Sequence, residues 1–301
     1  MPAIKTTALT KVYGDVTAVD SLDLTVRAGE IFGFLGPNGA GKSTTIALLM
    51  DYIKPSHGEV KVLGSDPQAD VRALHNRIGI LPDRFSLYDR LTGEAHLDYA
   101  IDAKGAADDP KTLLSQVGLT EAGDQRTEKY SHGMQQRLAL AMALVGDPEL
   151  LILDEPFTGL DPNGAKKVRE IVYNVNEQGT TVFFSSHVLG QVALVCDRVG
   201  ILNGGQLVAE GAVSDLRTEA GIPDELIIET TGVPDDATTA VESVDGVVDV
   251  ERDNETLVVS TLRMDNRRRI LRAIEEAGTT IETFSLREAS VEEIFTTYAG
   301  E

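Results

Sequence analysis

Short runs of apolar residues alternate, over the first two thirds of the chain, with longer stretches in which apolar positions recur every three or four residues. The clearest runs cover residues 31–35, 78–81, 150–153 and 181–184. Strands that are apolar throughout are typical of a sheet buried on both faces. The pattern therefore predicts an α/β domain with a parallel sheet and helices on each side.

Strand signals are missing between residues 87 and 144, where helices are predicted near 92–103, 110–117 and 133–144. We interpret this stretch as a helical subdomain inserted in the α/β domain.

After residue 218 the predicted order becomes strand, helix, strand, strand, helix, strand, over 226–230, 235–242, 247–251, 256–260, 266–277 and 280–286, with a last helix near 291–298. This is the ferredoxin-like order. We expect two domains, 1–218 and a small α+β domain over 219–301.

The charge balance adds a constraint on partners. Acidic residues number 48 and basic residues 27, for a formal net charge of −21, while 42% of residues are hydrophobic, as in globular proteins. Such a surface repels nucleic acid, so no nucleic-acid partner is expected. Because concentrated salt screens self-repulsion, we favour a protein of a halophilic archaeon over an ordinary acidic protein.

Several absences favour a cytoplasmic location. No apolar run approaches the roughly 20 residues of a membrane-spanning helix, and the first residues, Met1–Lys5, contain no signal-like apolar segment. The single Cys196 excludes an intrachain disulfide.

The strongest motif follows the first predicted strand and matches GxxxxGK[ST]. It consists of Gly36, Pro37, Asn38, Gly39, Ala40, Gly41, Lys42 and Ser43, and Thr44 follows it. Backbone N–H groups of such a loop cradle phosphate oxygens, the lysine reaches the β and γ phosphates, and the serine holds Mg²⁺. A plain glycine-rich turn is the alternative, but the strand-to-helix context favours a phosphate site.

Two adjacent carboxylates, Asp154 and Glu155, end the predicted strand at 150–153. The carboxyl end of a buried strand is the usual place for a metal ligand in an open α/β sheet. We expect Asp154 to bind the metal and Glu155 to face the attacking water. Two adjacent acidic residues at a strand end can also be ordinary residues of a solvent-exposed turn. We favour a functional role here because the pair follows a phosphate-binding loop along the chain.

The stretch from Tyr130 to Arg137 (YSHGMQQR) resembles the signature of the ATP-binding cassette (ABC) ATPases, LSGGQ. Ser131 and Gly133 match it, whereas His132 replaces its first glycine. A hydroxyl and backbone N–H groups at a helix N-terminus still form an anion site. His132 either adds positive charge there or is an exposed histidine without a role.

The resemblance extends from about residue 4 to 216, with the family's motifs in order. Tyr13 matches the aromatic residue that stacks on adenine, and 158–161, ending in Asp161, is similar to the D-loop. Ser185, Ser186 and His187 resemble the switch strand, which implies that His187 contacts the γ-phosphate.

One position departs from the family. Asp83 stands where the family generally has glutamine after a strand. A carboxylate still suits Mg²⁺, but it is shorter by one methylene and adds negative charge, so we expect it to act through a bridging water.

The resemblance implies a P-loop NTPase cassette with a helical insertion and an accessory C-terminal α+β domain. It also implies that two copies form a homodimer around two ATP, with Glu155 as general base and Lys42 and His187 stabilising the transferred phosphoryl group. Residues 79–83 and the tail 289–295 are similar to exporter-type cassettes of the drug-resistance and multidrug-efflux group. That similarity implies a separate integral membrane permease, export, and a place at the cytoplasmic face of the membrane.

Two alternatives stay open. A soluble ABC ATPase acting on ribosomes or DNA is opposed by the single cassette, by the acidic surface and by the lack of room for a long coiled coil between phosphate loop and signature. The only basic patch, Arg267–Arg269 with Arg272, is explained more simply as a solvated helix face. The C-terminal domain could instead sense a ligand or dimerise.

Overall fold

The computed structural model describes residues 1–187, 195–232, 235–287, 293 and 296–298. The chain divides into two compact units, Met1–Ala212 and Val213–Glu301. Their boundary precedes helix α8 (Val213–Glu219), whereas the sequence analysis expected it after residue 218.

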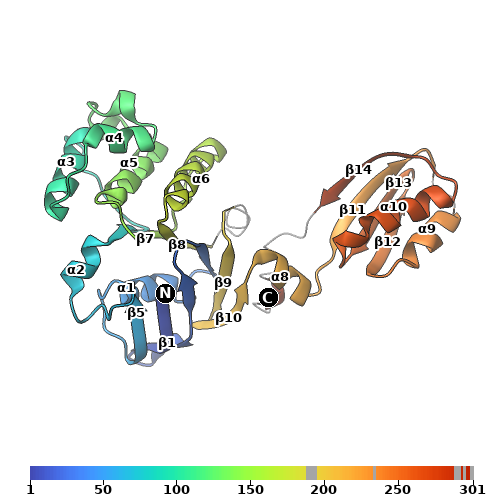
Figure 1. Ribbon diagram of the computed structural model, residues 1–301, viewed down its shortest axis with the longest axis horizontal. Coiled ribbons are helices and arrows are strands. Elements are labelled where there is room, and N and C mark those ends of the chain that lie inside the picture. The colour runs from blue at the N-terminus through green and yellow to red at the C-terminus, as the bar shows by residue number, and fades with distance from the viewer. Residues whose placement is uncertain (188–194, 233–234, 288–292, 294–295, 299–301) are drawn as a thin grey trace. The chain divides into compact units, whose positions relative to one another are not determined.

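A six-stranded sheet forms the centre of the first unit (Figure 1). In sheet order its strands are β10 (Gln206–Gly211), β9 (Arg198–Asn203), β4 (Ile31–Leu35), β8 (Thr181–Ser186), β7 (Leu150–Asp154) and β6 (Ile78–Leu81). Neighbouring strands run parallel except β10, which is antiparallel to β9. Strands β4 and β7 are buried at every residue, which confirms the interpretation of the apolar runs.

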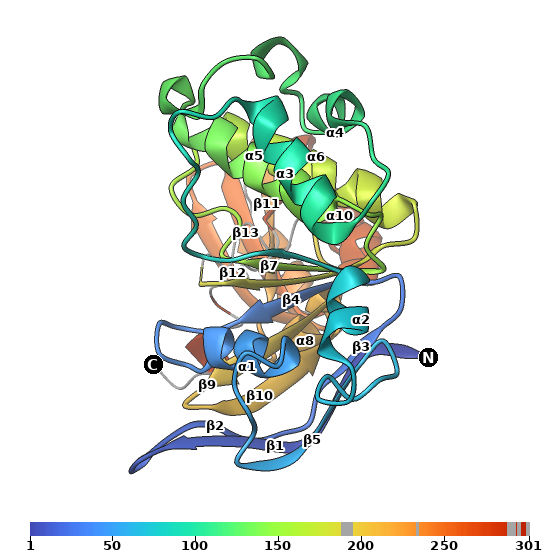
Figure 2. The ribbon, with the colours of Figure 1, turned by 90° about the vertical axis from the view of Figure 1, so that its left-hand side faces the viewer.

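A second, antiparallel sheet was not predicted. Its long strand β1 (Pro2–Tyr13) pairs with β2 (Val16–Leu22), β3 (Thr25–Arg27) and β5 (His57–Val62). Register shifts interrupt these pairings, and threonines and lysines separate the buried apolar residues of β1, so its sequence lacks a clean alternation. Helix α1 (Lys42–Leu49) lies between the two sheets in Figure 2, and one continuous apolar core joins them.

Helices α5 (His132–Leu144) and α6 (Pro162–Glu177) cover the other face of the central sheet (Figure 2). Helices α3 (Gly93–Lys104) and α4 (Pro110–Gln116) pack with α5, and the short α2 (Val71–Asn76) precedes β6. The three helices predicted between residues 87 and 144 are confirmed. Lys104, at the end of α3, donates to the carbonyls of Ile78 (3.0 Å) and Val145 (2.8 Å), which ties these helices to the sheet.

The second unit continues after α8 with six elements in the predicted order. They are β11 (Asp224–Thr230), α9 (Asp235–Glu242), β12 (Val247–Asp253), β13 (Thr256–Thr261), α10 (Arg267–Glu276) and β14 (Ile281–Arg287). The antiparallel sheet has the order β12-β13-β11-β14, and its core includes Leu226, Val259 and Ile270. The ferredoxin-like arrangement is therefore confirmed. Half of the helix predicted near 291–298, and all of the tail 289–295 except residue 293, lie outside the described residues.

Candidate functional site

The glycine-rich loop connects the buried strand β4 to helix α1. Gly41 precedes the helix with φ of +108°, and a Cβ there would lie 2.4 Å from the Ala18 carbonyl oxygen. A Cβ on Gly36 would lie 2.5 Å from the carbonyl oxygen of Leu202. Glycine is therefore required at both positions because neighbouring backbone approaches the loop so closely.

Lys42 opens helix α1 and is buried. Its ammonium donates to the carbonyls of Gly36 (2.7 Å) and Pro37 (3.2 Å), both in the loop. Its third neighbour is a carboxylate oxygen of Glu155, at 3.4 Å. The loop thus folds around its own lysine and holds the charge at the N-terminal end of α1.

Glu155 follows β7 in a left-handed backbone conformation, with φ of +53°. That conformation is costly for a residue other than glycine and is commonly retained at functional sites. The backbone N–H of Glu155 donates to the Ser185 carbonyl oxygen at 3.2 Å. The carboxylate, 10% exposed, accepts a hydrogen bond of 2.8 Å from Nδ1 of His187. Glu155 therefore joins Lys42 to His187.

Asp154, the last residue of β7, is buried and accepts a hydrogen bond from the hydroxyl of Ser185, and the Ser43 hydroxyl also interacts with it. Burial raises the pKa of Asp154, the two hydroxyls oppose that shift, and the charges of Asp83 and Glu155 add to it. The site thus concentrates negative charge where solvent is largely excluded, an arrangement suited to a cation.

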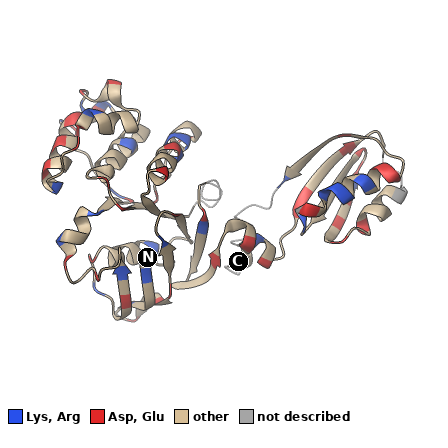
Figure 3. Cartoon of the chain, viewed as in Figure 1, with Lys and Arg blue, Asp and Glu red and all other residues tan. Residues whose placement is uncertain are grey.

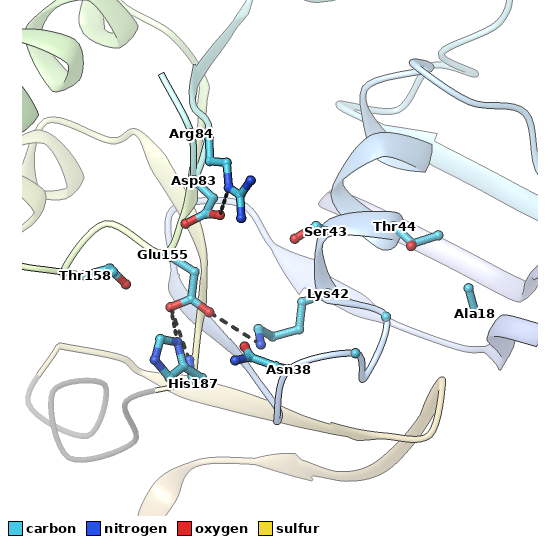
Figure 4. A pocket seen from close by; sticks show the side chains of 12 residues that line it. Ala18, Asn38, Lys42, Ser43, Thr44, Asp83, Arg84, Glu155, Thr158 and His187 are labelled. Carbon is cyan, nitrogen blue, oxygen red and sulfur yellow. Dashed lines mark hydrogen bonds and ion pairs between the residues drawn. The ribbon is translucent and has the colours of Figure 1, made fainter. Parts of the chain in front are cut away.

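Lys42, Glu155 and His187 lie around one cavity of about 410 Å³ (Figure 4). Its lining is Ala18, Asn38, Gly39, Gly41, Lys42, Ser43, Thr44, Asp83, Arg84, Glu155, Thr158 and His187. The structure therefore brings together most of the predicted phosphate-loop residues with the predicted catalytic residues. Asp83 lies at the cavity wall, half-exposed, with the Arg84 guanidinium 3.8 Å away.

The sequence analysis did not include Ala18, Arg84 or Thr158 in the site. Ala18 comes from strand β2, whose position beside the loop follows only from long-range packing. Arg84 directly follows Asp83, and Thr158 is the first residue of the D-loop motif 158–161, so nearness in sequence to predicted site residues was the available signal.

Seven predicted nucleotide-binding residues do not line this cavity: Gly36, Pro37 and Ala40 of the loop itself, and Tyr13, Ser131, Gly133 and Asp161 outside the loop. Tyr13 ends β1, 47% exposed, with the Lys11 ammonium 5.0 Å from its ring. Ser131 caps α5 by accepting from the backbone N–H of Met134 (3.3 Å), and Asp161 caps α6 by accepting from that of Gly164 (2.8 Å).

Oxygen donors at the cavity fit the chemistry of Mg²⁺. Ser43 and Asp83 line the cavity and supply a hydroxyl and a carboxylate. Asp154 does not line it but interacts with Ser43 and supplies a second carboxylate next to it. Among the described residues no group of three or more His, Cys, Asp or Glu side chains could hold a metal ion by itself. Mg²⁺ typically takes one or two carboxylates together with phosphate oxygens, so this donor set is appropriate.

Two family models match the chain. Residues 19–158 match the ABC transporter family, and residues 211–299 match the C-terminal domain of DrrA1-3-like ATP-binding proteins. Within the described part of the chain, no helix is both long and apolar enough to cross a membrane.

Curated relatives match nearly the whole chain. The daunorubicin/doxorubicin resistance ATP-binding protein DrrA of Streptomyces peucetius is 34% identical, over 99% of this chain and 92% of that protein. The fluoroquinolones export ATP-binding protein of Mycobacterium tuberculosis is also 34% identical, over 94% of this chain and 88% of its own length.

Solved structures agree with the fold. The ATP-binding subunit of an ABC transporter superposes with a TM-score of 0.66 at 28% identity, covering 73% of this chain and 93% of that one. A cassette solved as a dimer in a post-hydrolysis state, bound to ADP and Pi, superposes with a TM-score of 0.62 at 25% identity. The match covers 70% of this chain and 98% of that one. These comparisons favour a transporter ATPase over a soluble ATPase acting on ribosomes or DNA. The chain is therefore an ATPase that belongs to the ABC transporter ATP-binding proteins of the drug-resistance, DrrA type.

Proposed function

We propose that this chain hydrolyses ATP in a site completed by a second copy of itself, and that hydrolysis drives export through a separate membrane permease. The observation that carries the proposal is the convergence of Lys42, Glu155 and His187 on one cavity beside the glycine-rich loop (Figure 4). Phosphoryl transfer needs mostly positioning and charge stabilisation, which these groups supply.

The triphosphate binds at the N-terminal end of α1. Backbone N–H groups of the loop and the positive end of the helix dipole attract its β and γ phosphates. The Lys42 ammonium is already fixed by the carbonyls of Gly36 and Pro37, so it is pre-positioned for a phosphate oxygen. Such an oxygen competes with Glu155 for Lys42 and leaves the carboxylate of Glu155 to bind water.

Glu155 is the general base, and His187 orients it. Because a carboxylate only accepts, the 2.8 Å contact has Nδ1–H of His187 donating to Glu155. A protonated imidazole donates from both nitrogens, so Nε2 can bond the γ-phosphate while Nδ1 holds Glu155.

Ser43 and Asp154 would hold Mg²⁺, and Asp83 would act through a bridging water. The ion would neutralise phosphate charge when bound. Around it, Ser185 keeps the Asp154 carboxylate in place by donating its hydroxyl hydrogen.

A second copy supplies the rest of the site. Ser131 and Gly133 stand at the exposed start of α5, and Asp161 at the start of α6, outside the cavity of their own chain. An N-terminal turn with a serine hydroxyl suits a phosphate held by another molecule. ATP contacts both copies only in the closed dimer and therefore favours that state.

The names of the relatives support both a membrane partner and export as the direction of transport. Their names describe drug resistance and export, which supports an exporter with an integral permease, and this chain would then act at the cytoplasmic face of the membrane. We expect the helical subdomain, residues 87–144, to contact that permease. The net charge of −21 supports an origin in a high-salt cytoplasm, as in halophilic archaea.

The test is Glu155→Gln, which keeps the shape of the side chain but removes the base. We expect ATP binding and ATP-induced dimerisation to persist while turnover falls by about 10²–10⁴-fold, the usual contribution of a general base. Glu149→Gln is the matched control, because Glu149 pairs with Arg77 at an exposed position outside the cavity. Near-normal turnover in Glu155→Gln, or a chain that stays monomeric with ATP and Mg²⁺ both alone and with its permease, would contradict the proposal.

A further inference from the structure

His132 is the first residue of α5, directly after the N-cap Ser131. Its side chain is exposed. The family signature has glycine at this position, and the sequence left open whether the histidine has any role. Its contacts in the structure point to a third role, that of positioning the turn after Glu155.

The His132 ring reaches the turn that follows Glu155. Its Nε2 lies 3.2 Å from the carbonyl oxygen of Thr158, and because a carbonyl only accepts, Nε2 carries the hydrogen. The ring also lies against Gly159, where a Cβ would come within 3.0 Å of Nε2. Gly159 has φ of +72°, so glycine is favoured there by the backbone as well as by the ring.

A second link lies one helical turn farther along α5. The buried amide of Gln136 donates to the carbonyl oxygen of Pro156 at 3.1 Å. Residues four apart lie on the same face of a helix, so His132 and Gln136 hold the same turn at two points. That turn leads from Glu155 to Asp161, the cap of α6, and its Thr158 lines the cavity beside Glu155.

We propose that His132 is a positioning residue that couples the start of α5 to the turn carrying Glu155. This inference rests on the proposed function, in which α5 acts on the ATP of the other copy while Glu155 acts on its own. When the start of α5 closes onto the ATP bound by the other copy, the hydrogen bond from His132 to Thr158 moves the turn with it. Glu155, at the beginning of that turn, changes position as a result. Gln136 holds only the near end of the turn, at Pro156, so its hydrogen bond does not reach Thr158 as that of His132 does.

The test measures kcat and KM for ATP in the full chain with its permease, for the parent, His132→Ala and His132→Gln. We expect kcat to fall about fivefold in His132→Ala, which corresponds to one ordinary hydrogen bond, with KM within about twofold of the parent. His132 does not line the cavity of its own chain, so we expect the affinity of that cavity for ATP to change little. Glutamine offers an N–H donor without charge, so His132→Gln is expected to recover most of the lost kcat.

His57→Ala is the matched control, because His57 is an exposed histidine on strand β5 that does not line the cavity. Thermal unfolding of each variant separates lost positioning from lost stability. An unchanged kcat in His132→Ala would overturn the inference, and so would rescue by His132→Lys but not by His132→Gln, since that result would mean that positive charge on the phosphate matters. A parent chain without ATPase activity would instead count against the proposed function.

Discussion

The buried carboxylate of Asp154 lowers the stability of the folded chain at a position where it would bind a metal ion. Burial raises its pKa above the ordinary value of about 3.9, so the folded chain holds this proton more tightly than the unfolded chain. Ionisation of Asp154 therefore lowers the free energy of unfolding. This loss of stability is absent at a pH below the pKa that Asp154 has in the unfolded chain, and it is complete at a pH above its pKa in the folded chain. Ionised Asp154 destabilises the nucleotide-free chain at neutral pH.

We accordingly expect Asp154→Asn to raise the Tm of the nucleotide-free chain at pH 7, while hydrolysis is lost. The amide keeps an oxygen that accepts from Ser185 and removes the buried charge. The gain should shrink as the pH falls through the folded pKa towards about 4. Thermal unfolding at both pH values checks this, and a lower Tm for Asp154→Asn at pH 7 would refute it.

Asp83 poses a different question at the same cavity, because its carboxylate is half-exposed and Arg84 lies only 3.8 Å away. If Asp83 acts near Mg²⁺ through a bridging water, Asp83→Asn weakens that contact and raises the Mg²⁺ concentration needed for half-maximal ATPase activity. Arg84→Gln is the control, since it removes the neighbouring charge and keeps the carboxylate. Identical Mg²⁺ titrations for Asp83→Asn and the parent would exclude a role for this carboxylate.

Among the helices and strands, those whose signal lies in one contiguous stretch of sequence could be predicted. Strands β4 and β7 are apolar at every position, and α3, α4 and α5 begin at the capping residues Thr92, Asp109 and Ser131, so all were predictable. Strand β1 was missed because polar residues interrupt its buried positions and its pairing has register shifts.

The same distinction applies to the site. Lys42, Asp154 and Glu155 belong to contiguous motifs at strand ends, where their roles could be expected. The contribution of Ala18 to the cavity and the reach of His132 to Thr158 depend on packing between segments far apart in sequence. No local pattern encodes such contacts.

The approach of α5 to strand β6 gives an element-scale prediction. A Cβ on Gly79, in β6, would lie 2.1 Å from the Ala143 carbonyl oxygen of α5. Because that neighbour is backbone, Gly79→Ala should destabilise the chain by about 3 kcal/mol, the upper part of the range for overpacking. Ile80→Val, at the adjacent half-buried position, should cost only about 0.5 kcal/mol. Equal urea midpoints for Gly79→Ala and the parent would contradict this account of the contact.

For the molecule as a whole, the dominant physical fact is a net charge of −21. Figure 3 shows acidic residues on elements of both units, and its clearest basic group lies on α10, where Arg267–Arg269 are exposed. None of these three arginines forms an ion pair with another described residue. Acidic residues outnumber basic residues by 21, and like charges within about 10 Å repel at 0.1 M salt.

Raising KCl from 0.1 to about 1 M shortens the screening length to about 3 Å, so we expect the urea midpoint of unfolding to rise. A variant with Glu229→Gln, Asp249→Asn and Glu251→Gln, three exposed carboxylates of the second unit, provides the control. It removes repulsion that salt would otherwise screen, so it should gain stability in 0.1 M KCl and respond less to added salt. A parent chain whose stability is the same at both concentrations would show that self-repulsion is minor and would remove the physical basis for a high-salt origin.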